Sequence, residues 1–305
     1  MKRYNVPRLA FVNKLDRQGS NPWNVIKQLR DQLKLNAAAV QIPVGLESSH
    51  IGVVDLIDQK AIYFEGEKGE FVKHGEIPSD MMSLVEEKRM ELIERLADCD
   101  DEVAEMFLME EIPDPEFIKA AIRRQTIACA FVPVFMGSAF KNKGVQPLLD
   151  GVVDYLPQPI EKDNYALDRS KGEERVKVSS KDDDPLLALA FKLDETQYGQ
   201  LTYMRIYQGK LKKGNFVTNV NSGKKVKLAR IVRMHSNEME EIDMAGAGEV
   251  VAMFGIDCRS MDTFSDGDTD LVLSSMFVPV SSRIESAEFS ILLPGQADRL
   301  LFFYC

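Results

Sequence analysis

The sequence has few of the residues that build metal centres and disulfide frameworks. It contains three histidines and four cysteines, Cys99, Cys129, Cys258 and Cys305, which are widely spaced and form no C-x-x-C pair. Zinc sites and redox pairs need closely spaced ligands. We therefore expect no metal site, and we expect reduced cysteines of the kind found inside cells.

Long apolar runs and targeting signals are also missing. No segment approaches the roughly 20 apolar residues that cross a bilayer. The first residues show neither the apolar stretch of a signal peptide nor the extended Arg/Ser-rich pattern of a transit peptide. We expect no membrane association and no targeting signal in this chain.

A phosphate-binding loop of the form G-x-x-x-x-G-K-[ST] does not occur. Such a loop holds nucleotide phosphates, and nearby Ser/Thr and Asp side chains hold Mg²⁺. Two D-x-x-G strings begin at Asp16 and Asp243. The first lies in a loop with another assignment, described below, and the second lies in a β-rich region, so we interpret both as accidental. We expect no catalytic residue and no nucleotide hydrolysis in this chain.

Charge is distributed unevenly, although the formal net charge is −10. Residues 80–116 contain fourteen acidic and three basic side chains, whereas residues 205–233 contain nine basic and no acidic ones. An acidic module is therefore followed by a basic one, which points to different partners for the two regions.

Residues 1–157 show an α/β pattern that is interrupted. Residues 8–13 and 131–136 are short apolar runs typical of buried strands, and a helical pattern follows each of them. The intervening residues, about 40–129, combine strand-like and helical segments. We expect a partial α/β domain with an α+β insertion.

The rest of the chain changes character. Residues 158–184 are polar and charged, and we interpret them as a linker. From 185 to about 279, short segments of period two alternate with Gly/Asn turns, which is typical of an all-β barrel. The final residues, 280–305, end in an apolar run for which we see no partner.

The motif Asn13-Lys-Leu-Asp16 follows the first strand, where a base-recognising loop belongs. The carboxylate of Asp16 can accept both donors on one edge of guanine, N1–H and the exocyclic amine, which adenine does not offer. Asn13 suits the O6/N7 side and the loop backbone, and the aliphatic stem of Lys14 can cover the base. Taken alone, four polar residues in a loop also occur by chance.

A second loop, residues 137–144, follows the other buried strand and precedes a helix. The small residue Ala139 would let a backbone N–H approach guanine O6, Ser138 can brace the loop, and Phe140 could cover the base opposite Lys14. A glycine-rich connection of this kind is common in α/β proteins. Two such loops in this order, each at a strand end, are much less common.

These two segments, Asn13-Lys-Leu-Asp-Arg17 and residues 137–150, resemble the fourth and fifth GTP-binding motifs of translational GTPases, in particular elongation factor G. The 122 positions between Asp16 and Ser138 match the inserted subdomain of that family. Further segments resemble the mitochondrial form, among them Ala61-Ile-Tyr-Phe-Glu-Gly66 and Phe254-Gly-Ile-Asp-Cys258. The resemblance extends to about Pro279, although Met261 stands where the family usually has glycine.

The resemblance implies a P-loop-type GTPase domain followed by a translation-factor barrel, with GTP and Mg²⁺ as ligands of the family. It implies GTP-driven movement of tRNA and mRNA on the ribosome, in the mitochondrial matrix, by a monomer. The barrel would contact small-subunit rRNA, for which the candidates are Lys210, Lys212, Lys213, Lys224, Lys225, Lys227, Arg230 and Arg233. Without the resemblance, these residues fit a solvated barrel edge equally well.

The acidic helices between residues 80 and 116 could meet a basic ribosomal stalk protein, although a solvated helix face explains most of their individual residues. We expect the chain to be a fragment that lacks the first part of the GTPase domain and the later domains, with a non-native tail at 280–305. Two other functions remain open: a non-hydrolysing ribosome-binding regulator, and a related GTPase of ribosome recycling, release or protection.

Overall fold

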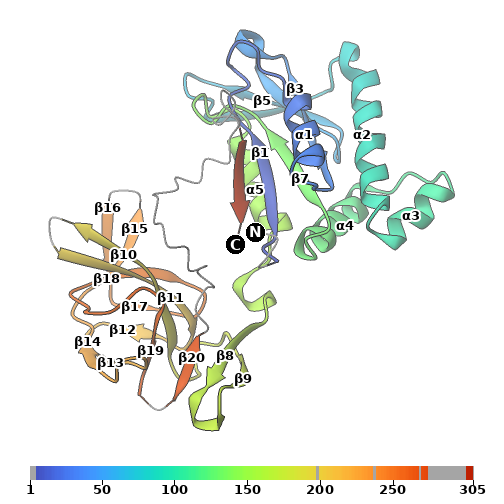
Figure 1. The fold of residues 1–305 in the computed structure, drawn as a ribbon. Coiled ribbons are helices and arrows are strands. Elements are labelled where there is room, and N and C mark those ends of the chain that lie inside the picture. Colours follow the sequence, from blue (N-terminus) through green and yellow to red (C-terminus); the bar gives the residue numbers. More distant parts are fainter. Residues whose placement is uncertain (1–4, 197–198, 236–237, 268, 274–299, 305) are drawn as a thin grey trace. The chain divides into compact units, whose positions relative to one another are not determined.

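The computed structural model describes residues 5–196, 199–235, 238–267, 269–273 and 300–304. The chain divides into two compact units, Met1–Pro157 with Glu285–Cys305, and Gln158–Ile284. Figure 1 shows the helices in the first unit and a strand-rich second unit.

A four-stranded sheet forms the centre of the first unit. Its order is β2 (Ala37–Ala39), β7 (Val132–Met136), β1 (Arg8–Val12) and β21 (Leu300–Tyr304). The strands β2, β7 and β1 are parallel, and Val12 lies opposite Met136. The carboxyl ends of neighbouring parallel strands lie at the same edge of a sheet. The loops that follow β1 and β7 therefore begin side by side.

Helices cover this sheet and the insertion. They are α1 (Pro22–Asp31), α2 (Met82–Ala97), α3 (Asp101–Leu108), α4 (Pro115–Ile127) and α5 (Val145–Tyr155). Three of them begin at a side-chain cap: Asn21, Asp100 and Asp114 each accept a backbone N–H of the first turn. The sequence pattern predicts α1 and α5 after the two buried strands, as observed.

The insertion between β2 and β7 begins with an antiparallel meander. Its strands are β3 (Gln41–Val44), β4 (Gly52–Asp55), β5 (Lys60–Glu65) and β6 (Phe71–Gly75), with the short helices η2 (Glu47–Ser49) and η3 (Ser79–Met81). One continuous hydrophobic core joins it to the central sheet and includes Phe11, Ile42, Leu92 and Ile122. The insertion is therefore packed against the sheet as part of one unit.

The end of the chain corrects one expectation. We expect from the sequence that the apolar tail has no partner, but Leu300–Tyr304 pairs antiparallel with β1, from Arg8 opposite Tyr304 to Val12 opposite Leu300. An unpaired strand edge leaves its N–H and C=O groups without partners, and this pairing satisfies them. Residues 280–299 of the predicted tail lie outside the described residues.

The second unit contains an eight-stranded antiparallel sheet. Its order is β14 (Lys225–Lys227), β13 (Phe216–Asn219), β19 (Asp262–Ser265), β10 (Leu187–Thr196), β11 (Gly199–Gln208), β18 (Val250–Phe254), β15 (Ile231–His235) and β16 (Glu238–Ile242). The pair β12 (Leu211–Lys212) and β17 (Met244–Ala245) contributes Leu211 and Ala245 to the core that lies under this sheet. Inward-facing Met204, Ile206 and Phe264 belong to the same core, as expected of a barrel interior.

The predicted linker, 158–184, is not a linker in the structure. It holds η4 (Pro159–Glu161), β8 (Asn164–Asp168), η5 (Arg169–Lys171) and β9 (Glu174–Val178). The strands β8 and β9 form a three-stranded sheet with β20 (Leu271–Leu273), and Ala166 and Val178 are buried in a small core. The two strands pair with each other, and β20, from the far end of the barrel sequence, pairs with β8. The predicted barrel end at 279 lies outside the described residues.

Candidate nucleotide-binding site

The two predicted base-recognising loops leave neighbouring strand ends and continue to contact each other. The N–H of Gly137 donates to the carbonyl of Val12 at 2.9 Å, and the N–H of Leu15 donates to the carbonyl of Gly137 at 3.1 Å. The strand pairing thus extends beyond β1 and β7 into the loops. This extension holds the loops in one register.

The side chain of Asn13 joins the two loops directly. Its Oδ1 accepts hydrogen bonds from the N–H of Lys14 and from the N–H of Ala139, both at 2.8 Å. From the sequence we expect a backbone N–H of the second loop to approach guanine O6, and in this structure the N–H of Ala139 donates to Asn13. Lys14 has a φ of +64°, a left-handed conformation that is uncommon outside glycine.

Asp16 is half-buried, and its carboxylate makes no hydrogen bond within the residues that the structure describes. Both of its oxygens are therefore available as acceptors, which a bidentate pair with the N1–H and amine of guanine requires. Backbone hydrogen bonds nevertheless order the loop around Asp16. The N–H of Arg17 donates to the carbonyl of Lys14, and the N–H of Ser20 donates to the carbonyl of Arg17.

The second loop is closed by Ser138, which is fully buried. Its N–H and C=O pair with Lys143, and its Oγ accepts from the N–H of Lys141 at 3.3 Å. Phe140 is 89% exposed at the loop tip, with the Lys141 ammonium 5.7 Å from its ring centre. An exposed ring at this position is free to cover a flat ligand.

Two glycines allow the second loop its narrow shape. A Cβ on Gly137 would lie 2.1 Å from the Lys143 carbonyl oxygen, so any larger residue would break the bridge between Ser138 and Lys143. Gly144 has a φ of +83° and caps the start of α5. The glycine-rich pattern therefore has a local steric reason.

Sequence reasoning missed the residues that support these loops from the insertion. The N–H of Glu47 donates to the carbonyl of Leu15 at 2.7 Å, and its Oε1 accepts from the N–H of Gly19 at 2.7 Å. The Lys143 ammonium donates to the carbonyl of His50 at 2.7 Å. Pairs this far apart in the chain leave no periodic pattern, so only the tertiary structure reveals them.

His50 is buried against both loops. Burial lowers the pKa of its imidazole; the nearby Lys143 adds to this lowering, while the bond to the Gly45 carbonyl and the charge of Asp16 oppose it. Its Nδ1 lies 3.3 Å from that carbonyl, and its Nε2 has no hydrogen-bond partner among the described residues. The imidazole is therefore neutral at neutral pH.

The residues present fit the guanine part of GTP, since Asn13 and Asp16 offer the complementary groups on the first loop and Asn13 is hydrogen-bonded to the second. Among the described residues, no three or more His, Cys, Asp or Glu side chains gather as metal ligands would. Burial also raises the pKa of the Cys99 thiol to about 11, so this thiol is protonated and a poor metal ligand.

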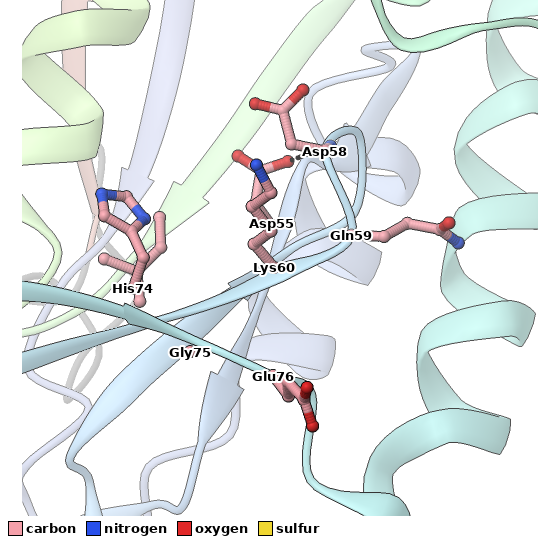
Figure 2. A pocket seen from close by; sticks show the side chains of 8 residues that line it. Asp55, Asp58, Gln59, Lys60, His74, Gly75 and Glu76 are labelled. Atoms are coloured by element: carbon pink, nitrogen blue, oxygen red, sulfur yellow. Dashed lines mark hydrogen bonds between the residues drawn. The ribbon is translucent and has the colours of Figure 1, made fainter.

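A separate cavity of about 670 Å³ lies on the insertion, beside the turn between β4 and β5 and the strand β6 (Figure 2). None of the residues predicted to recognise guanine lines it. Its Asp55 accepts the N–H groups of Ile57 and Asp58, and burial raises the pKa of this carboxyl. Lys119 pairs with Asp58 at 3.0 Å. Asp55 is thus occupied in closing the turn, and Asp58 is neutralised by Lys119.

The eight basic residues predicted to contact rRNA separate into two groups in the second unit. Five are paired with carboxylates: Lys210 with Asp182, Lys213 and Arg230 with Glu241, Lys224 with Asp257, and Arg233 with Glu249. The pattern of basic residues without acids between 205 and 233 hides these pairs, because the acids come from other parts of the sequence.

Lys212, Lys225 and Lys227 form no ion pair within the described part of the chain. Lys225 and Lys227 lie on β14, and the Lys225 ammonium is 5.5 Å from the ring centre of Phe216, which is 54% exposed on the paired strand β13. Lys212 lines a cavity of about 340 Å³ that three consecutive aspartates, 182–184, also line. The β13–β14 hairpin therefore presents the least neutralised positive charge.

Comparison with known proteins agrees with this arrangement. Residues 1–158 match the family described as "Elongation factor Tu GTP binding domain", and residues 199–269 match "Elongation factor Tu domain 2". Among the described residues, no helix is long and apolar enough to span a bilayer.

The chain is 57% identical over 279 residues to mitochondrial elongation factor G-1 of Arabidopsis thaliana, an alignment that covers 92% of this chain and 37% of that protein. A crystal structure of a Thermus thermophilus protein matches with a TM-score of 0.68 at 25% identity, over 88% of this chain and 37% of that one. The chain thus spans little more than a third of each relative. It belongs to the translational GTPase family that carries the elongation factor Tu GTP-binding domain, and it is a homologue of mitochondrial elongation factor G.

Proposed function

We propose that this chain supplies the guanine-recognising loops and a ribosome-contacting β-domain of an elongation factor G-type translocase. In that role the protein drives the movement of tRNA and mRNA on the ribosome after peptide-bond formation, at the expense of GTP, in the mitochondrial matrix. The sequence similarity to a mitochondrial elongation factor G supports both the activity and the location.

One observation carries the proposal: Asn13 bridges to Ala139 while the carboxylate of the neighbouring Asp16 makes no hydrogen bond in the described region. The bridge holds the two loops side by side, which supports a shared ligand position. Asp16 then pairs with the N1–H and the amine of guanine. Adenine would leave the carboxylate desolvated and unpaired, which costs on the order of 1–3 kcal/mol or more because the group is charged.

The ribosome is the proposed partner of both modules. The β13–β14 hairpin offers Lys225, Lys227 and the exposed ring of Phe216 to small-subunit rRNA, where lysines contact phosphate and an aromatic ring can stack on a base. The acidic surface of α2 and α3 suits a basic stalk protein. No second copy of the chain is needed for either contact, and we propose a monomer.

We propose further that this chain recognises guanine without hydrolysing GTP. It contains no G-x-x-x-x-G-K-[ST] segment, so the groups that hold phosphate and stabilise charge during phosphoryl transfer are not among its residues. Contacts to the base alone give modest affinity, and guanosine is therefore a suitable probe.

The test is a base-specificity exchange at Asp16. Guanosine, inosine, xanthosine and adenosine are titrated into the purified chain and into Asp16→Asn, with the ¹⁵N–¹H shifts of Gly19 and Ala139 as the readout. The unsubstituted chain should prefer guanosine over inosine by about tenfold, the value of one charge-assisted hydrogen bond. The Asp16→Asn variant should lose this preference and should bind xanthosine more tightly, because the C2 carbonyl of xanthosine accepts a hydrogen bond from the asparagine amide. Equal binding of guanosine and adenosine by the unsubstituted chain would refute the proposal.

A further inference from the structure

Glu47 of the insertion holds the Asp16 loop at both ends. Its N–H donates to the carbonyl of Leu15, and its carboxylate accepts the N–H of Gly19, each at 2.7 Å. Leu15 and Gly19 flank the three residues 16–18. One residue of η2 therefore determines where this loop begins and ends in space.

The backbone of Glu47 is itself held in an uncommon conformation. Its φ is +59°, in the left-handed region that non-glycine residues rarely adopt. Gly45, two residues earlier, has a φ of +74°, and a Cβ there would lie 2.1 Å from the Ser49 carbonyl oxygen. The turn 45–50 is thus tightly folded, and its shape aims both groups of Glu47 at the loop. Such conformations persist only where the surroundings determine them.

The same turn, together with the β5–β6 connection, supports the second loop. The Lys143 ammonium donates to the carbonyl of His50 at 2.7 Å, and the Gln146 amide donates to the carbonyl of Gly69 at 3.0 Å. Gly69 approaches so closely that a Cβ there would lie 2.8 Å from the carbonyl oxygens of Lys141 and Asn142. Both guanine-recognising loops therefore rest on the insertion.

We propose that Glu47 is a positioning residue for guanine recognition: its paired hydrogen bonds orient the Asp16 carboxylate toward the base. This inference rests on the proposed function. The positioning role of Glu47 makes the insertion part of the nucleotide site. A ligand that shifts the 45–50 turn would then change the affinity for guanine, and guanine would change the affinity for that ligand by the same factor.

The test compares Glu47→Ala and Glu47→Gln with the matched control Glu86→Ala, since Glu86 is exposed on α2 and contacts neither loop. Guanosine and inosine are titrated into each full-length chain, and amide hydrogen exchange is measured at Gly19. Glu47→Ala should weaken guanosine binding by about tenfold, the value of a lost hydrogen bond to a charged acceptor. It should also speed exchange at Gly19.

The diagnostic readout is the preference for guanosine over inosine, which reports the pairing of Asp16 with the exocyclic amine. A misoriented Asp16 loses this preference, whereas general loosening of the fold weakens both nucleosides equally. Glu47→Gln keeps an acceptor oxygen and should restore most of the preference, and Glu86→Ala should match the unsubstituted chain.

Faster exchange at Gly19 in Glu47→Ala with an unchanged guanosine preference would overturn the inference and leave the proposed function intact. Unchanged exchange and unchanged binding would overturn it as well. Failure of the unsubstituted chain to bind guanosine, with Gly19 still protected through Glu47, would overturn the proposed function, and the recognition role of Glu47 with it.

Discussion

Asn13 and Ala139 lie 126 positions apart in the sequence, and the side-chain oxygen of the first accepts a 2.8 Å hydrogen bond from the backbone N–H of the second. The same oxygen also accepts from Lys14. One amide oxygen therefore maintains the shape of the first loop and its distance from the second.

Asn13→Ala removes the acceptor for both N–H groups, and we expect it to lower guanosine affinity by about tenfold or more, since each lost hydrogen bond contributes on the order of 1 kcal/mol. Asn13→Asp keeps an acceptor oxygen and should preserve the loop geometry while losing the amide donor to the base. Nucleoside titration monitored at the Ala139 amide checks both variants. An Asn13→Ala chain with unchanged shifts and affinity would contradict this role.

Replacing Lys225 and Lys227 together should weaken RNA binding more than replacing Lys213 and Lys224, because Glu241 and Asp257 already neutralise the latter pair. We expect Lys225→Ala/Lys227→Ala to reduce the slope of log K against log salt by roughly 1 per lysine. The measurement is fluorescence anisotropy with an RNA stem-loop at several salt concentrations. Equal effects of the two double variants would show that pairing with carboxylates does not determine which lysines contribute to RNA binding.

Stability should fall on acidification through His50. Burial lowers the pKa of this imidazole from its usual 6.5, so the unfolded chain binds the proton more readily than the folded one. The contribution of His50 to the free energy of unfolding is fully present above pH 6.5. It is lost as the pH falls from 6.5 through the lowered pKa of the folded state.

His50→Asn should therefore flatten the dependence of the unfolding free energy on pH below 6.5. Lys143 and Asp16 are the charged side chains that act on the imidazole. Urea unfolding at a series of pH values measures the effect, and His74→Asn, at an exposed position, serves as the control. If both variants behave alike, burial of His50 does not govern this part of the profile.

Gly151→Ala should destabilise the protein, although alanine is favoured over glycine in a helix by up to about 1 kcal/mol. A Cβ at this position of α5 would lie 2.2 Å from the ring of buried Phe135. Overpacking of this kind costs about 1–3 kcal/mol, which exceeds the gain in helix propensity. Urea denaturation gives the sign, and the effect should shrink in a Phe135→Leu background, where the ring is absent.

Local patterns in the sequence determined the elements with strong periodicity. The apolar runs of β1 and β7 and the helices that follow them are present where the pattern indicates, and the second unit consists of antiparallel strands, as its alternating pattern predicts. The base-recognising motifs could be placed at strand ends for the same reason: each follows directly from a buried strand. Residue type alone predicts Asp16 as the carboxylate for guanine.

Tertiary packing decided what local propensity could not. Ala37–Ala39 forms the strand β2, although alanine favours helices, because three small side chains fit beside β7 and under two helices. The polar segment 158–184 holds two strands because β20 pairs with it. Met261 adopts a φ of +75° in a turn that would suit glycine.

The sequence by itself determined the family and predicted the residues for guanine recognition, because both are written in short contiguous motifs. Only the tertiary structure decided which groups support them and which charges stay free. Glu47, His50 and Gly69 reach the loops across the insertion, and Glu241 and Asp257 neutralise lysines that look unpaired along the chain. Hydrogen bonds and ion pairs depend on distances of a few ångströms, and separation along the sequence says nothing about those distances until the chain is folded.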